Sequence, residues 1–194
     1  AGGNVDWYNS ITTSSGAIDI ASGGVFSAEG AGNMTSAGAI TVRSTGNLTF
    51  NSFTHNLTSS SDIRLGVGSG ATLDATNANI VSMGAGRWFT YLTNPLAGHS
   101  FGTSFDDANV GFKQYGAAFG ASPLGTGNGR MYTDSPNLSG SLGGSVTKVY
   151  DGGTSVSMSG ANFSGAPTGA IDSDDVSAAL TLSGGTGTLA SANV

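Results

Sequence analysis

One pentapeptide has the form of a catalytic motif, Gly-His-Ser-Phe-Gly at residues 98–102. In hydrolases with this pattern the serine is a nucleophile on a strand-turn-helix, and an acid and then a histidine follow it in the chain. No histidine follows His99, and the other histidine, His55, precedes it. The sequence therefore predicts no catalytic residues, and we interpret the match as chance in a chain rich in glycine and serine.

The candidate metal ligands are also too scattered to predict a site. His55 and His99 have no partner at zinc-ligand spacing. The acidic loop with Asp172, Asp174 and Asp175, and the pair Asp106-Asp107, could offer oxygen ligands to calcium. Both lack the periodic Gly-Gly-x-Gly-x-Asp pattern of calcium-binding β-rolls. We expect solvated loops, with no metal and no cofactor.

Composition favours an all-β protein with many turns. The 194 residues include 33 glycines, no cysteine and a single glutamate, and only 9% of them are charged. With so few helix formers, a helical bundle or an alternating β-α protein is disfavoured. Glycine-rich segments such as Gly66-Val67-Gly68 are expected to be turns, because no helix follows to complete a phosphate site.

Charge and termini limit the possible partners and locations. The net charge is −6 and the isoelectric point is about 4.4, which disfavours binding to nucleic acid or to an anionic membrane. The absence of cysteine is compatible with bacterial secretion. The chain starts with Ala-Gly-Gly-Asn, so we expect it to be a piece of something longer.

A repeat of 23 residues runs through the first half of the chain. Asn33-Met34-Thr35 recurs as Asn56-Leu57-Thr58 and as Asn79-Ile80-Val81, and Ile40-Thr41-Val42 recurs as Ile63-Arg64-Leu65. The short alternating segments are typical of strands with one buried face. Three strands per coil of about 23 residues predict a right-handed parallel β-helix over residues 1–86. Asn33, Asn56 and Asn79 are then structural residues at one corner of successive coils, where each amide can bond the next.

Residues 87–145 are rich in aromatic side chains, beginning with Arg87-Trp88-Phe89-Thr90-Tyr91-Leu92. An open coil end exposes unpaired backbone and apolar side chains, so a solenoid needs a bulky cap. We therefore predict that this segment is a capping and transition region. The alternative is that the aromatic patch stacks on sugar rings.

The last segment, residues 146–194, reads as a partial β-sandwich. Val146 to Thr154 has the pattern of a strand that runs into an Asp-Gly turn. Further alternating segments follow, but the 49 residues are too few to close a full sandwich. A missing strand leaves unpaired amides that a strand from another chain could fill.

These motifs resemble known families. The coils followed by Gly86-Arg87-Trp88-Phe89-Thr90-Tyr91-Leu92-Thr93-Asn94-Pro95 resemble the C-terminal part of filamentous-haemagglutinin-like exoproteins of two-partner secretion systems. Lys148-Val149-Tyr150-Asp151-Gly152, followed by Thr154, looks like the opening of a YDG-type module, a bacterial Ig-like repeat of such adhesins. The resemblance implies that Arg87, Trp88, Tyr150, Asp151 and Gly152 are structural motif residues.

The resemblance implies a non-enzymatic surface adhesin that is exported through an outer-membrane secretion partner. Its ligand would be an unknown receptor or glycan on host or bacterial surfaces, and its location secreted or on the bacterial cell surface. One alternative is a self-assembling filament subunit joined by strand exchange between chains. Another is a β-helix that binds or degrades carbohydrate, although Asp19, Glu29, Asp62 and Asp74 do not form the carboxylate cluster that such enzymes use.

Overall fold

The computed structural model describes residues 2–95, 97–142, 148, 151, 153–158, 163–169 and 185–188. The chain forms two compact units, Ala1–Ser135 and Pro136–Val194. Within the described residues all regular structure is β-strand except one 3-10 turn, η1 (Asp107–Asn109). Among the described residues, no helical segment has the length and hydrophobicity of a membrane span.

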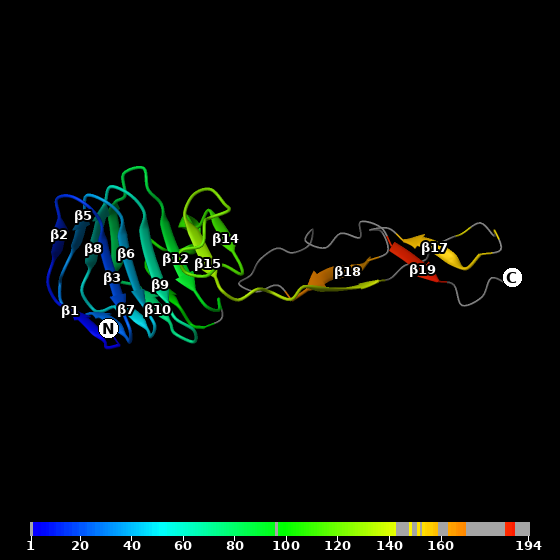
Figure 1. Cartoon of the computed structure of the whole chain (residues 1–194), viewed down its shortest axis with the longest axis horizontal. Helices are drawn as coiled ribbons and strands as arrows, with labels where there is room; N and C mark the ends of the chain where they lie inside the picture. Colours follow the sequence, from blue (N-terminus) through cyan, green and yellow to red (C-terminus); the bar gives the residue numbers. More distant parts are fainter. Residues whose placement is uncertain are drawn as a thin grey trace. The chain divides into compact units, whose positions relative to one another are not determined.

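The first unit is a stack of coils, and each coil contributes one short strand to each of three sheets (Figure 1). The first two coils contain β1 (Val5–Trp7), β2 (Ile11–Thr13), β3 (Ile18–Ser22), β4 (Phe26–Ala28), β5 (Met34–Ser36) and β6 (Ile40–Ser44). The next two contain β7 (Leu48–Phe50), β8 (His55–Ser59), β9 (Ile63–Val67), β10 (Leu73–Ala75), β11 (Ala78–Ser82) and β12 (Trp88–Leu92). The prediction of a parallel β-helix with three strands per coil of about 23 residues is confirmed.

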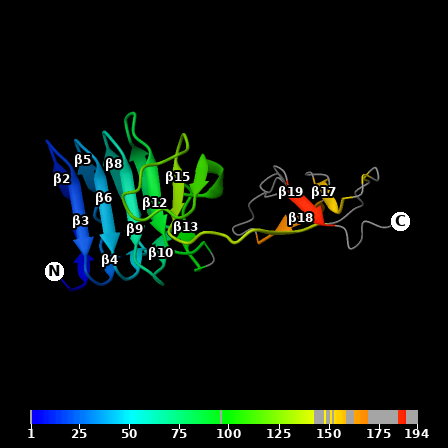
Figure 2. The ribbon, with the colours of Figure 1, turned by 45° about the vertical axis from the view of Figure 1, so that its right-hand side comes forward.

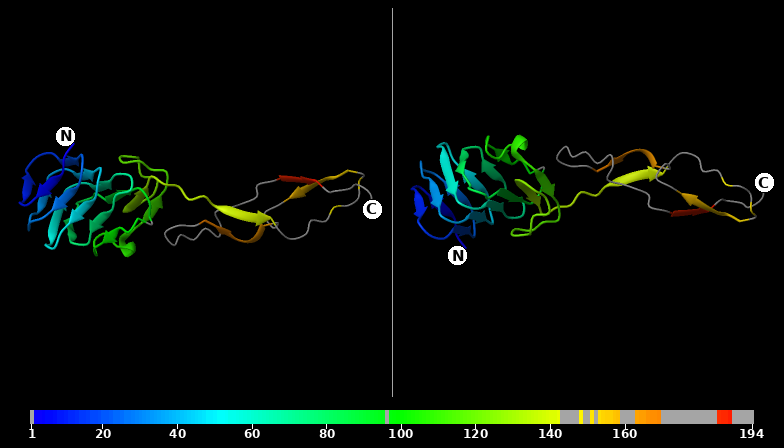
Figure 3. Two further views of the ribbon diagram at one scale, coloured as in Figure 1. Left: turned by 90° about the horizontal axis from the view of Figure 1, so that it is seen from below. Right: turned by 90° about the horizontal axis from the view of Figure 1, so that it is seen from above.

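Three parallel sheets form the walls of this solenoid, as Figure 2 shows. Sheet A contains β1, β4, β7, β10 and a later strand, β13 (Ser100–Phe101). Sheet B contains β2, β5, β8 and β11. Sheet C contains β3, β6, β9 and β12, followed by β15 (Gly129–Tyr132) and β14 (Phe112–Gln114). Figure 3 shows the same stack from two opposite sides.

The sequence repeat becomes vertical rows of side chains inside the solenoid. In sheet C, Ile40 pairs with Ile63 of the next coil, and two residues further along Val42 pairs with Leu65. All four side chains have no exposed surface. Burial of one such side chain stabilises the fold by about 1.5–3 kcal/mol. One extra residue in a strand would turn the following buried side chains to the solvent side, so the stabilisation from several of them would be lost.

Buried serines satisfy the backbone at the corners. The Ser36 hydroxyl donates to the Gly16 carbonyl of the coil below over 3.1 Å, and the Ser59 hydroxyl donates to the Gly38 carbonyl over 2.7 Å. Gly38 has to be glycine because an added Cβ would lie 2.9 Å from the Gly16 carbonyl oxygen. The corners can therefore stack as closely as the strands do.

The solenoid continues past residue 86, the predicted end of the β-helix. Trp88–Leu92 is the third strand of the fourth coil, because Trp88 and Thr90 extend the inner rows above Ile63 and Leu65. Leu92 also belongs to the inner core, whereas Phe89 and Tyr91 are buried on the outer side of sheet C. The aromatic segment thus divides between the core and the outer face.

The end of the stack uses strands out of chain order. After β13 the chain adds η1 and then β14 as the last strand of sheet C, and only later inserts β15 between β14 and β12. The partner of Thr90 in β15 is Arg130. The inner row that starts with apolar side chains therefore reaches a charged one at Arg130, and Lys113 of β14 pairs with Arg130 beyond it.

Arg130 closes the core as a buried plug. Its residue is 3% exposed, and its guanidinium group forms an ion pair with the Asp107 carboxylate. It also donates to the Phe105 carbonyl over 2.9 Å and lies 3.9 Å from the centre of the Phe101 ring. A desolvated guanidinium supported in this way ends the apolar column without leaving bare apolar surface.

A histidine is buried in the middle of the core. His55 has no exposed surface, and its ring centre lies 5.3 Å from that of Trp7 and 5.6 Å from that of Phe50. Its Nδ1 lies 3.1 Å from the Gly32 carbonyl oxygen and donates to it, whereas Nε2 has no partner among the described residues. Desolvation lowers the pKa of His55 below its ordinary value of 6.5, so the core holds the uncharged ring.

The described strands of the second unit form two antiparallel pairs. β16 (Ser139–Leu142) pairs with β18 (Phe163–Thr168), and β17 (Ser155–Met158) pairs with β19 (Gly185–Thr188). One of the alternating segments expected after the Asp-Gly turn, Val156-Ser157-Met158, lies in β17. The unit begins ten residues before the predicted module at 146, because β16 forms within the segment 87–145 that was predicted to be a capping and transition region.

The two residues of the Arg130–Asp107 ion pair are expected to contribute unequally to stability. Arg130→Ala is expected to lower the free energy of unfolding of the solenoid by about 2–5 kcal/mol, because it opens a cavity and leaves the Phe105 carbonyl without its donor. Asp107→Ala removes a carboxylate that is 85% exposed, so we expect a loss below about 1 kcal/mol. Urea unfolding of both variants measures the difference, and equal losses would contradict the role of Arg130 as the plug.

The buried histidine predicts a loss of stability in mild acid. Because the folded-state pKa of His55 is lowered, the unfolded chain takes up a proton near pH 6.5 while the folded chain resists it. The contribution of the neutral ring is full above about pH 6.5 and decreases as the pH falls below it. Urea unfolding at pH 7.5 and 5.5 should show this slope in the natural chain, and His55→Phe should reduce it. An unchanged slope in the variant would assign it to other groups.

Candidate functional site

Basic and aromatic side chains gather on the outer face of sheet C, which points away from the core. Arg43 in β6 and Arg64 in β9 occupy outward positions, and Arg87 directly precedes β12. These are three of the four arginines in a chain of net charge −6. This concentration makes the outer face of sheet C the candidate functional surface of the solenoid.

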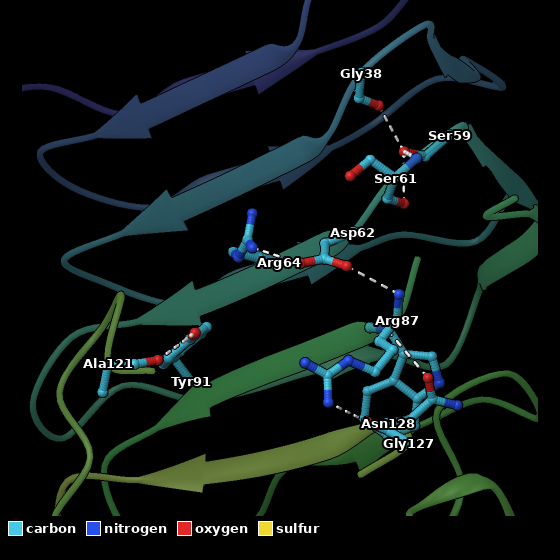
Figure 4. A network of polar contacts seen from close by, with 11 residues as sticks. Gly38, Ser59, Ser61, Asp62, Arg64, Arg87, Tyr91, Ala121, Gly127 and Asn128 are labelled. Carbon is cyan, nitrogen blue, oxygen red and sulfur yellow. Dashed lines mark hydrogen bonds and ion pairs between the residues drawn. The ribbon is translucent and has the colours of Figure 1, made fainter. Parts of the chain in front are cut away.

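Asp62 fixes two of these arginines (Figure 4). One carboxylate oxygen forms an ion pair with the Arg64 guanidinium, and the other accepts the Arg87 backbone N–H over 3.0 Å. The Arg64 guanidinium lies 5.9 Å from the centre of the Phe89 ring. Asp62 therefore joins the third coil to the fourth and holds Arg64 over the aromatic surface.

A covering loop, residues 115–128, packs over the outer face of β12. The Arg87 guanidinium lies 4.8 Å from the Phe89 ring centre and donates to the Gly125 carbonyl over 3.0 Å. The Tyr91 hydroxyl donates to the Ala121 carbonyl over 3.2 Å, as Figure 4 shows. Burial raises the pKa of Tyr91, against the attraction of Arg64. The loop thus covers a small second core on this face.

Phe119 of the covering loop fits a slot in sheet C. Gly66 is the floor of the slot, because an added Cβ would lie 2.3 Å from the Phe119 ring. The Tyr91 ring lies on one side with a centroid separation of 4.8 Å, and the Arg43 guanidinium lies 5.6 Å from the Phe119 ring centre. Gly66 was expected in a turn, but it lies within β9, where the missing side chain makes room for the ring.

A groove of about 400 Å³ opens beside Phe119. It runs across the ends of β3, β6 and β9 and into the corners that follow them. Its lining is largely small and apolar, and Arg43 is the charged residue among its lining residues. The full lining is Ala21, Ser22, Gly23, Arg43, Ser44, Thr45, Gly66, Val67, Gly68 and Phe119.

The three asparagines predicted at a corner lie in one column of sheet B: Asn56 and Asn79 are residues of β8 and β11, not of a corner, and Asn33 directly precedes β5. The Asn56 backbone N–H donates to the Asn33 side-chain carbonyl over 2.9 Å, and the Asn79 amide donates to the Asn56 side-chain carbonyl over 3.0 Å. Ser104 ends the column by donating to Asn79 over 3.2 Å. One contact thus joins two side-chain amides and the other joins the Asn33 amide to the Asn56 backbone, and both hold successive coils together.

The other predicted motif residues lie in separate places. Arg87 and Trp88 stand at the start of β12, one on the outer face and one in the core. Asp151 is exposed; it forms an ion pair with Lys148 over 2.7 Å and accepts the Gly153 N–H over 2.9 Å. The hydrogen bond from Lys148 lowers the pKa of Asp151. Tyr150 and Gly152 lie outside the described residues.

The residues of the rejected catalytic and metal motifs serve the fold. His99 Nδ1 accepts the Leu73 N–H over 3.0 Å, and its Nε2 donates to the Asn94 carbonyl over 2.9 Å. Asp107 pairs with Arg130, and Asp106 accepts the Asn109 amide over 2.8 Å. No group of three possible metal ligands meets within the described part of the chain. The acidic loop at Asp172, Asp174 and Asp175 lies outside it.

Comparison with known proteins gives one positive result. The YDG domain model matches residues 134–194. The match contains the second compact unit and begins two residues before it. No curated protein matches the chain, and no solved structure matches it.

The slot, the groove and the plug were not predicted from the sequence. The repeat does predict which residues lie together on the outer face of sheet C. Because Ile40 aligns with Ile63, Arg43 and Gly66 must lie side by side. No such signal exists for Phe119 or Arg130, because they follow insertions that break the 23-residue spacing. Phe119 belongs to a loop, and Arg130 pairs with Thr90 across 40 residues.

The slot predicts that two substitutions are not additive. Gly66→Ala is expected to displace Phe119 and lower the free energy of unfolding by about 1–3 kcal/mol. Phe119→Ala removes the ring that would be displaced, so adding Gly66→Ala to it should cost little more. A double-mutant cycle by urea unfolding measures this coupling, and additive losses would show that Phe119 does not occupy the slot in solution.

Proposed function

We propose that this chain is a non-enzymatic segment of a secreted bacterial surface adhesin, in which the solenoid is a rigid rod that extends and displays an adhesive surface. The observation that carries the proposal is the parallel stacking of coils on three sheets in register. Each coil is bonded to its neighbours along three walls, so bending must break several ladders at once. Such a stack can hold a binding surface at a fixed distance and transmit force, which a flexible linker does less well.

The second unit supports the same function. Its match to the YDG domain, together with a β-solenoid before it, fits an adhesin-like protein. We further propose that the parent protein is a filamentous-haemagglutinin-like exoprotein, exported by an outer-membrane partner of a two-partner secretion system. Its ligand is then a receptor or glycan on a host or bacterial surface, and nucleic acid is disfavoured by the net charge of −6.

Three acidic side chains of the coils, Glu29, Asp62 and Asp74, support a non-enzymatic role, because each of them has a structural partner of its own. Glu29 accepts hydrogen bonds from Ser27 and Asn51, and Asp74 accepts the Thr76 N–H over 3.0 Å. Asp62 is bound to Arg64 and to the Arg87 backbone. Glycosidic hydrolysis needs two carboxyl groups that face one substrate, and these carboxylates are instead committed to separate contacts.

The proposal predicts that the folded chain alone mediates attachment. Beads coated with the full chain are expected to bind epithelial or bacterial cells at least several times more often than uncoated beads. The control is Leu57→Asp, which places a carboxylate in the solenoid core, where Leu57 has no exposed surface. Equal attachment by coated and uncoated beads would contradict the adhesin proposal. Polymers of the natural chain in light scattering would favour the filament subunit instead.

A further inference from the structure

The groove beside Phe119 exists because small residues surround one arginine. On the outer face of sheet C, Arg43 stands between Ala21 of the preceding coil and Gly66 of the next. Neither neighbour has a side chain that could fill the space beside the long arginine side chain. Phe119 occupies part of that space over Gly66 and leaves the rest open as the groove of about 400 Å³.

The polar groups along the groove are already committed, except for the arginine. The Ser22 hydroxyl donates to the Val25 carbonyl over 2.8 Å, and the Ser44 hydroxyl donates to the Gly46 carbonyl over 2.7 Å. The Thr45 hydroxyl donates to the Gly23 carbonyl. What the groove offers a ligand is therefore a floor of C–H groups and one charged side chain.

Arg43 differs from the other arginines of the solenoid. Arg64 pairs with Asp62, Arg87 donates to backbone carbonyls, and Arg130 pairs with Asp107. Arg43 is exposed and forms no ion pair within the described part of the chain; its contact there is with the Phe119 ring. That ring holds the guanidinium at the rim of the groove, where its paired donors suit a carboxylate.

We propose that this groove binds an acidic saccharide, whose carboxylate pairs with Arg43 and whose apolar ring face packs on Ala21 and the Phe119 side chain. The inference rests on the proposed adhesin function and names the ligand class of its surface. A volume of about 400 Å³ lies within the range of small-ligand sites. The groove is open along the sheet, which suits a unit of a longer glycan; a fatty acid would need an enclosed cavity to remove its chain from water.

Calorimetric titration of the full chain with glucuronic acid, N-acetylneuraminic acid and neutral glucose tests the proposal. At least one acidic sugar should bind, and glucose should bind at least tenfold more weakly. Arg43→Gln is expected to weaken binding of the acidic sugar at least tenfold, and Ala21→Leu should abolish it by filling the groove. The matched control is Lys113→Gln, which removes the same charge from β14 outside the groove and should leave binding unchanged.

Several results would overturn the inference. These are the absence of binding by either acidic sugar, equal binding of glucose, or equal loss in Arg43→Gln and Lys113→Gln. Acetate that competes as well as the sugar would show that the groove recognises charge without a saccharide, which also overturns it. If coated beads attach to cells while neither sugar binds, the adhesin proposal stands and the groove inference fails.

Discussion

The structure depends on backbone hydrogen bonding between coils in strict register. A parallel strand in the stack is bonded both to the coil before it and to the coil after it, so each residue must occupy the level that its neighbours set. The inner aliphatic rows, the asparagine column and the serine-glycine corners all repeat because of this constraint. A side chain that suits one coil is acceptable only if it also fits the coils on either side.

At the end of the stack, side chains provide the hydrogen-bond acceptors that backbone carbonyls of the next coil provide elsewhere. Within the solenoid the Leu48 N–H is accepted by the Thr72 carbonyl of the next coil, whereas the Leu73 N–H is accepted by the imidazole of His99. Arg130 likewise replaces the apolar residue that a further coil would place above Thr90. The same holds on the outer face of sheet C, where a side chain from outside the repeat also fills a space in the stack. Gly66 leaves room in the sheet for the Phe119 ring of the covering loop.

The sequence was informative where the repeat holds and much less so where it stops. The coils around Asn33, Asn56 and Asn79 could be predicted because spacing alone determines which residues stack. The placement of Trp88 to Leu92 could not be predicted, because its alternating pattern suits a strand of a cap as well as a strand of a coil. Only its pairing with Ile63 to Gly66 shows that it belongs to the fourth coil. Phe119 depends on loop closure, which leaves no periodic trace, and residues such as Tyr150 lie outside the described structure.

The order of strands at the end of sheet C also has a consequence for folding. β14 is synthesised before β15 but lies beyond it, so β14 has no sheet edge to join until β15 has paired with β12. The earlier coils can form one after another as the chain emerges, whereas the last layer must wait for residues 129–132. Until then this edge of β12 has no paired strand. The cap is thus a late, concerted event at the end of an otherwise sequential assembly.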